Sequence, residues 1–145
     1  MADNVTLVHN LFDAWNNRDF DAVANAVAPD CKIVDMGSGR TLEGPDGFAA
    51  FSTALFEAMP DAQFTLDHVT AQGDTVVVEY TGRGTNTSDL VLPAGTVPAT
   101  GRSITVPVCE IDEIRNDKIA SARVYVDSGA IMAQLGITER VGLTL

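Results

Sequence analysis

Two carboxylates interrupt otherwise apolar segments of this chain, and their placement suggests chemistry. Glu79 follows Val76-Val77-Val78, and Glu110 follows Val106-Pro107-Val108-Cys109. A carboxylate that faces an apolar interior is costly unless it is hydrogen-bonded, so such a group usually has a purpose. We therefore expect one of the two to line a pocket, and Glu110 is predicted to be a substrate-binding residue.

Other candidate pocket residues follow from strand alternation and aromatic character. His68 alternates with Phe64 and Leu66, which predicts that it points inward beside them, although a lone histidine on an apolar face is more often structural than a base. Aromatic side chains are core residues by default, but the inner ends of core elements also line pockets. The aromatic residues predicted to contact a substrate are Trp15, Phe51, Tyr80 and Tyr125.

Composition argues against several classes of partner. The chain has 2 histidines without a His-x-x-x-His pair, and no glycine-rich phosphate loop follows a predicted strand, so no metal and no cofactor are expected. Cys31 and Cys109 lie in separate apolar stretches and are expected to be buried free thiols. The net charge of -11 would repel phosphate backbones and anionic lipids. Nucleic acid and membrane partners are therefore not expected.

Length and hydrophobicity predict one domain over residues 1–145. Apolar residues make up 46% of the 145 residues, enough for a core, without a run long enough to cross a membrane. The segment Met1-Ala2-Asp3-Asn4 lacks the basic and apolar parts of a secretory signal. A soluble, cytoplasmic protein is expected.

Two helices are predicted at the start of the chain. Asn4 can cap a first helix and Asp19 a second, and apolar residues recur in both at intervals of three and four. The second helix is predicted to include Val27 and to end at Pro29-Asp30. Together they predict a helical hairpin.

Two more helices have clear boundaries. One begins near Gly44-Pro45-Asp46 and must stop before Pro60, because a residue that precedes proline disfavours the helical conformation. A short last helix is capped by Asp127-Ser128 and ends at Gly136.

Strands are predicted between these helices. The first covers residues 31–35, and the period-two pattern then marks residues 63–71, 75–83 and 104–126, the last broken at the Asn116-Asp117 turn. Helices that cover one face of a bent antiparallel sheet give an α+β fold in which the curved sheet encloses a pocket.

The segment 85–101 is too rich in proline and glycine for a continuous strand, which predicts a long loop or an excursion from the sheet. Residues 86–101 would form a flap over the pocket, or Leu90 and Leu92 would complete a dimer contact. Pro107 cannot donate to a sheet, so it indicates a bulge or an edge position.

Several short pieces, in order and spacing, resemble one known family. They are Met59-Pro60-Asp61-Ala62-Gln63-Phe64, Ala71-Gln72-Gly73-Asp74-Thr75-Val76-Val77-Val78, Gly84-Thr85-Asn86, Ala99-Thr100-Gly101-Arg102, Tyr125-Val126-Asp127 and Gln134-Leu135-Gly136. Together they resemble the SnoaL-like polyketide (ester) cyclases of the nuclear-transport-factor-2-like superfamily. This resemblance implies a cone fold, a small apolar or aromatic polycarbonyl ligand, and intramolecular aldol cyclisation by a carboxylate acid/base without a cofactor.

The resemblance implies roles for particular residues. In the cyclases the Asp of the Tyr-x-Asp piece is the general acid/base, which corresponds to Asp127 here, although an Asp at a helix start is also a favoured cap. Asn86 stands where the cyclases have His, so it cannot transfer protons but could orient a carbonyl. Trp15, Tyr80 and Tyr125 would shape the substrate.

Ketosteroid isomerases of the same superfamily offer an alternative. Asp35 follows the helical hairpin where they carry their proton-abstracting Asp, which makes it the second catalytic candidate. Their oxyanion-donating Tyr corresponds to Leu11, which weighs against isomerase activity. Asp112 falls near their second acid, but it is expected to be a solvated strand residue.

A hydratase or a non-catalytic binding module also stays open, and fold alone cannot choose among them. A deeply buried carboxylate in the pocket would favour an enzyme, whereas a closed or purely apolar pocket would favour the module. An open sheet face makes a homodimer the expected assembly.

Overall fold

The computed structural model describes residues 3–92 and 95–137. Its first helix, α1 (Asn4–Asn16), is capped by Asp3, whose side chain accepts a hydrogen bond from the Thr6 amide at 2.7 Å. The prediction that Asn4 is the cap was one residue late. Asn4 is the first helical residue, and its side-chain amide donates to the carbonyl of Gly73 at 3.1 Å.

The second helix, α2 (Phe20–Asn25), is capped by Asp19 as predicted, but it ends earlier than expected. Val27 begins the strand β1 (Val27–Asp35) and pairs with Ile119. Pro29 and Asp30 therefore lie inside β1 rather than at a helix end. They fall where the register shifts between Val27 and Lys32, so the missing amide of Pro29 interrupts no regular pairing.

The third helix, α3 (Gly44–Ala58), has Pro45 in its first turn and ends before Pro60, which confirms both predicted boundaries. Proline suits the first turn because its missing amide would have no partner inside the helix. Gly44 has φ +67°, a conformation that favours glycine, and a Cβ there would lie 3.0 Å from the carbonyl oxygen of Pro29.

The main sheet has six strands in the order β2-β1-β8-β7-β4-β3. Its pairs are antiparallel except β1 with β8, which run parallel, so the sheet is mixed. The strands besides β1 are β2 (Thr41–Glu43), β3 (Gln63–Gln72), β4 (Thr75–Thr85), β7 (Ser103–Arg115) and β8 (Lys118–Val126). Positive φ angles at Gly73, Asn116 and Asp117 form the two tight turns that were predicted to join β3 to β4 and β7 to β8.

Pro107 lies at an edge position, one of the two alternatives expected for it. It pairs with Thr81 of β4 without a bulge, but the pairing of β7 with β8 stops at Val108–Val126. The backbone of Thr105 bonds the side chain of Gln134 on the side away from β4. Backbone groups of residues two apart in a strand point to the same side. The nitrogen of Pro107 therefore also faces away from β4, beyond the end of β8.

The described residues of the segment 85–101 include two short strands. Its β5 (Leu90–Leu92) and β6 (Gly95–Val97) pair as a two-stranded hairpin, and β5 packs against α3. Leu90 is half-buried against the core, whereas the side chain of Leu92 lies outside the described residues.

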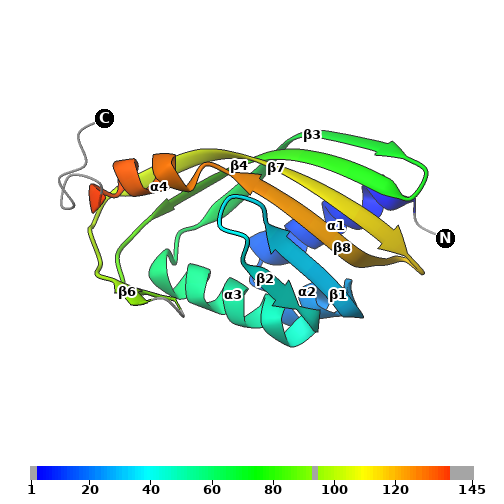
Figure 1. The fold of residues 1–145 in the computed structure, drawn as a ribbon, viewed down its shortest axis with the longest axis horizontal. Helices are drawn as coiled ribbons and strands as arrows, with labels where there is room; N and C mark the ends of the chain where they lie inside the picture. Colours follow the sequence, from blue (N-terminus) through cyan, green and yellow to red (C-terminus); the bar gives the residue numbers. More distant parts are fainter. Residues whose placement is uncertain (1–2, 93–94, 138–145) are drawn as a thin grey trace.

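Figure 1 shows the long strands arching over α1 and α3, with α4 (Ser128–Gln134) following the end of β8. The helices thus cover one face of the curved sheet, as the sequence predicted for a cone. Inward positions alternate along β4 and β7 and are buried, while their neighbours face outward. The core, and the pocket that opens from it, lie between this inner face and the helices.

Candidate functional site

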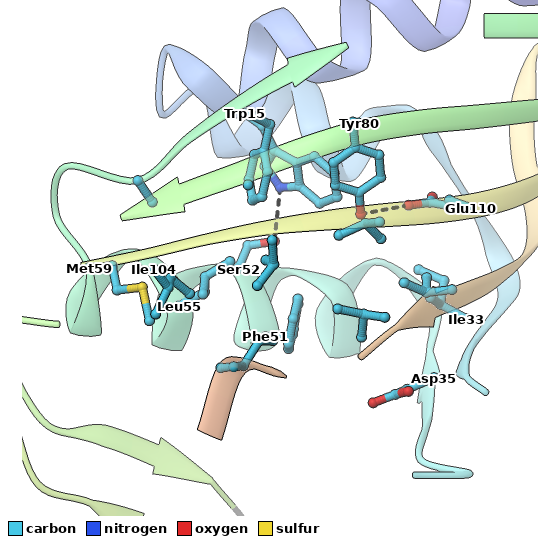
Figure 2. Close-up of a pocket in the computed structure, with 18 of the residues that line it drawn as sticks. Trp15, Ile33, Asp35, Phe51, Ser52, Leu55, Met59, Tyr80, Ile104 and Glu110 are labelled. Atoms are coloured by element: carbon cyan, nitrogen blue, oxygen red, sulfur yellow. Dashed lines mark hydrogen bonds between the residues drawn. The ribbon is translucent and has the colours of Figure 1, made fainter. Parts of the chain in front are cut away.

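A mainly apolar pocket of about 200 Å³ lies between the inner face of the sheet and α3 (Figure 2). The helix supplies one wall because residues at helical spacing share a face. The sheet supplies the other through inward positions of β1, β4, β7 and β8. The α3 residues in the lining are Phe48, Phe51, Ser52 and Leu55.

Trp15 fixes the aromatic end of the pocket. Its indole nitrogen donates to Ser52 Oγ at 3.0 Å, and Ser52 in turn donates to the carbonyl of Phe48 at 2.9 Å. The Trp15 ring lies 5.0 Å from the Phe48 ring between centroids. Because its polar atom is paired, Trp15 presents an apolar face to any ligand, which agrees with its predicted place in the pocket.

Tyr80 and Glu110 meet at the sheet wall, and Figure 2 shows the hydrogen bond between them. The Tyr80 hydroxyl donates to Glu110 Oε2 at 3.1 Å, and both side chains are buried. Burial raises the pKa of Glu110, while the neighbouring Asp112 and the hydrogen bond from Tyr80 offset part of that rise. Burial and the nearby charge of Glu110 raise the pKa of Tyr80 well above its ordinary value, so the phenol stays a neutral donor.

The expectation that either Glu79 or Glu110 faces inward is confirmed for Glu110. Glu79 is exposed on the outer face of the sheet, opposite Cys109. The two glutamates differ because they occupy opposite phases of the strand alternation.

Asp112 was predicted to be a solvated strand residue, and this is wrong. Its side chain is 0% exposed, and burial raises its pKa well above the ordinary value, with a further contribution from the nearby charge of Glu110. The prediction failed because Pro107 was expected to disturb the alternation of β7. The register with β4 continues unbroken through Pro107, so positions 104 to 114 keep one phase.

Asp35 is half-buried and lines the pocket, as its role as second catalytic candidate requires. Asp35 of β1 and Glu110 of β7 both pair with Val124 of β8, from opposite sides. Their Cα atoms are therefore two strand spacings apart, about 10 Å. Hydrogen bonds from the Gly37 amide at 2.9 Å and the Ser38 hydroxyl at 2.8 Å hold the Asp35 carboxylate.

Arg40, which sequence reasoning did not identify, also lines the pocket. Its guanidinium lies 5.5 Å from the centroid of the Phe51 ring and forms no ion pair with the described residues. Arg40 follows the glycine turn after β1, and its position so close to Asp35 in the sequence could have indicated that it lines the same pocket.

Asp127 caps α4 and does not line the pocket. Its side chain is exposed and accepts a hydrogen bond from the Ala130 amide at 3.0 Å. The capping alternative for this residue is therefore confirmed in the structure.

His68 is exposed, so the expectation that it points inward is wrong. The pairing of β3 with β4 shifts register between Leu66 and His68, and this bulge turns His68 outward and Val69 inward.

Asn86 and Tyr125 also lie away from the pocket lining. Asn86 is 0% exposed, and its side-chain oxygen accepts from the amide and the hydroxyl of Thr100, both at 2.9 Å, while its amide donates to Ser88. It fastens the ends of the 86–101 segment rather than facing a ligand. No described residue of that segment lines the pocket, so its predicted role as a flap has no support in this geometry. Tyr125 is 45% exposed on the outer face of the sheet.

The two cysteines are free, as expected, but only one is fully buried. Burial raises the pKa of Cys31 to about 11, with smaller contributions from Asp112, Asp30 and Glu110. Cys109 is half-buried on the outer face.

Within residues 3–92 and 95–137, no three side chains of the types that bind metals are gathered into a site. No helix in the same residues combines the length and the hydrophobicity needed to span a bilayer.

The sequence profile of the SnoaL-like polyketide cyclase family matches residues 5–135 of the chain. The protein therefore belongs to the SnoaL-like polyketide cyclase family. No curated protein matches this sequence.

Solved structures share the fold. A candidate SnoaL-like polyketide cyclase from Jannaschia sp. CCS1 is 24% identical with a TM-score of 0.79, covering 93% of this chain and 96% of its own. IdmH, a candidate polyketide cyclase from Streptomyces antibioticus, is 23% identical with a TM-score of 0.75, covering 90% and 96%. A candidate polyketide cyclase from Xanthomonas campestris pv. campestris is 26% identical with a TM-score of 0.73, covering 90% and 94%. These likenesses bear out the α+β cone predicted from the sequence.

Proposed function

We propose that this protein is a cofactor-free, cyclase-like enzyme that uses Glu110 as its acid/base group. The observation that carries the proposal is a carboxyl only 3% exposed in the lining of an apolar pocket, hydrogen-bonded by a buried tyrosine. A buried carboxylate is costly to keep, and such perturbed groups cluster at functional sites. A purely apolar pocket would instead have favoured a binding module.

The proposed reaction is an intramolecular aldol addition. The Glu110 carboxylate takes a proton from a carbon that lies between two carbonyls, and the resulting enolate attacks a ketone of the same molecule. A carbon–carbon bond forms, the ketone oxygen becomes an alkoxide, and the proton held by Glu110 passes to that oxygen. The product is an isomer of the substrate, so neither an oxidant nor a second reactant is needed.

The shape and polarity of the pocket favour an aromatic or polycarbonyl substrate. Trp15, Phe48 and Phe51 provide flat apolar surfaces that would fold a chain so that its reacting carbons approach each other. Arg40 and Asp35 add charged groups to the lining. An oxygen-rich end of the substrate would lie beside them, with Arg40 as a hydrogen-bond donor.

A second candidate is a proton-transfer enzyme of the isomerase or hydratase type that uses Asp35. The observation in its favour is that Asp35 lines the same pocket. Its carboxylate is already bonded within its own turn, and Leu11 stands at the position of the isomerase tyrosine. Asp127, the first candidate from sequence, would need a conformation in which it leaves its helix cap.

The experiment is hydrogen–deuterium exchange at an activated methylene, measured by NMR in D2O with ethyl benzoylacetate as the probe. The wild type is expected to accelerate exchange above the buffer rate, and Glu110→Gln is expected to lose that acceleration. Quenching of Trp15, the only tryptophan in the sequence, reports whether the variant still binds the probe. If Glu110→Gln binds and still accelerates exchange, Glu110 is not the base.

We also propose that the outer face of the sheet forms a homodimer contact. Tyr125 is 45% exposed there, beside Cys109 in the pairing of β7 with β8. Val77 and Ile111 lie half-buried on the same face, and exposed apolar side chains on an uncovered sheet face commonly serve an interface.

A further inference from the structure

Two carboxyl groups lie together behind the pocket wall. Glu110 and Asp112 are two residues apart on β7, so strand alternation directs both to the inner face. They are 3% and 0% exposed. Glu110 reaches the pocket lining, whereas Asp112 lies beyond it, between Val76 of β4 and Ala122 of β8.

Among the described residues, none near Asp112 balances a negative charge. No N–H or hydroxyl group of the described residues donates to either of its carboxyl oxygens. No ion pair in residues 3–92 and 95–137 involves Asp112 or Glu110. The titratable groups that act on the two carboxyls are Cys31 from β1, Tyr80 from β4, and Cys109 and Glu113 from β7 itself. None of these is a cation.

We propose that Asp112 is a positioning residue that keeps its proton and donates it in a hydrogen bond to Glu110, so that the pair carries one negative charge, on the glutamate that faces the pocket. Two carboxyl groups can hydrogen-bond each other only when one is protonated. Like charges buried this close cannot both ionise, and such a pair loses its protons in two separate steps.

The charge belongs on Glu110 because of its other partner. The Tyr80 hydroxyl donates to Glu110 at 3.1 Å and stabilises its ionised form, while Asp112 has no comparable donor. The raised pKa of both groups, with that of Asp112 raised well above its ordinary value, agrees with this order. Glu110 thereby receives two hydrogen bonds that orient it, one from each side.

The role of Asp112 in turnover rests on the proposed function of Glu110, but the retained proton does not. The proton is therefore measured on the ligand-free protein. Above about pH 4, where an unfolded aspartate ionises, the folded wild type holds a proton that the unfolded chain has released. Its unfolding constant should thus rise about tenfold per pH unit relative to Asp112→Asn, which has no such proton to hold.

Denaturant unfolding at a series of pH values gives this ratio for both proteins. Asp74→Asn is the matched control, because Asp74 is an exposed turn residue whose side chain makes no hydrogen bond with the described residues. The control should show no such trend. If Asp112→Asn fails to fold, Glu110→Gln replaces it. Without the charge of Glu110, Asp112 should release its proton at a lower pH, so the rise of the unfolding constant should end at a lower pH than in the wild type.

Infrared spectroscopy in D2O provides an independent readout. The wild type should show the carbonyl band of a protonated carboxyl near neutral pH, and the band should be missing in Asp112→Asn. A ratio of unfolding constants that stays flat with pH, or the absence of this band, would overturn the proposal whether or not Glu110 is catalytic.

The positioning role has its own signature in exchange kinetics. Asp112→Asn keeps a donor for Glu110 and should retain the pH profile of probe exchange, whereas Asp112→Ala removes the donor and should shift the profile to higher pH. A merely structural role would lower the amount of folded protein without moving the profile. Equal pH profiles for Asp112→Ala and the wild type would exclude the positioning role.

Discussion

Replacing Tyr80 with Phe removes one hydroxyl from the pocket wall and little else. Both Tyr80 and Glu110 are buried, and the hydroxyl is the donor that Glu110 receives from β4. A hydrogen bond to a charged group contributes about 1.5–3 kcal/mol, and one between neutral groups about 0.5–1.5 kcal/mol. At 3.1 Å this bond is longer than typical charge-assisted O–H···O contacts, so we use the lower end of each range.

The loss should therefore depend on pH. Where Glu110 is protonated, Tyr80→Phe is expected to lower the free energy of unfolding by about 0.5 kcal/mol, and where it is ionised by about 1.5 kcal/mol. The sign follows from linkage. The pKa of Glu110 in the folded protein is raised, so stability is lost as pH rises from the unfolded value of about 4.3 through the folded one. Without the Tyr80 donor that loss becomes larger.

Urea unfolding of both proteins at a series of pH values above the unfolded pKa of a glutamate measures how this difference changes with pH. The free energy of unfolding of Tyr80→Phe should fall further below that of the wild type as pH rises. A difference that does not change with pH, or that shrinks as pH rises, would refute the claim that Tyr80 stabilises an ionised Glu110.

Three other outcomes follow from the structure. Asp127→Ala should lower the free energy of unfolding by about 0.5–2 kcal/mol while Asp127→Asn stays near wild type, because Asn also caps helices; equal loss in both would remove the capping role. Cys31 should resist alkylation at about pH 8, where about one thiol in a thousand is ionised at a pKa of about 11, and mass spectrometry should find Cys109 modified first. Tyr125→Asp should shift the mass by light scattering toward the monomer if the outer face is the dimer contact, and an unchanged dimer would exclude that face.

The sequence predicted the fold well because its signals were local. Asp19 and Asp127 cap the helices that they were expected to cap, and α3 ends before Pro60. The errors arose where pairing with distant segments decides the structure. Val27 has a helical spacing from Val23, but its pairing with Ile119 places it in β1, a contact that no local pattern reveals.

The site was harder to predict, because the direction of a strand side chain depends on bulges. Trp15, Phe51, Tyr80, Glu110 and Asp35 line the pocket, since regular alternation or helical spacing directs them.

His68 was misplaced because a single bulge before it reverses every later residue of β3. Asp112 was misplaced for the opposite reason, because an expected disturbance at Pro107 is absent from the pairing of β4 with β7. Counting the alternation from Ile104 to Ile114 would have placed Asp112 and Glu110 on one face.

Glu110, rather than Asp35 or Asp127, is proposed to exchange the proton in the pocket. The most direct test compares Glu110→Gln, Asp35→Asn and Asp127→Asn side by side in deuterium exchange of ethyl benzoylacetate, with Trp15 fluorescence confirming that each variant binds the probe. Acceleration should be lost in Glu110→Gln and retained in Asp127→Asn, and Asp35→Asn should affect binding more than exchange. Loss of acceleration in Asp35→Asn or Asp127→Asn, with Glu110→Gln still active, would contradict this role of Glu110.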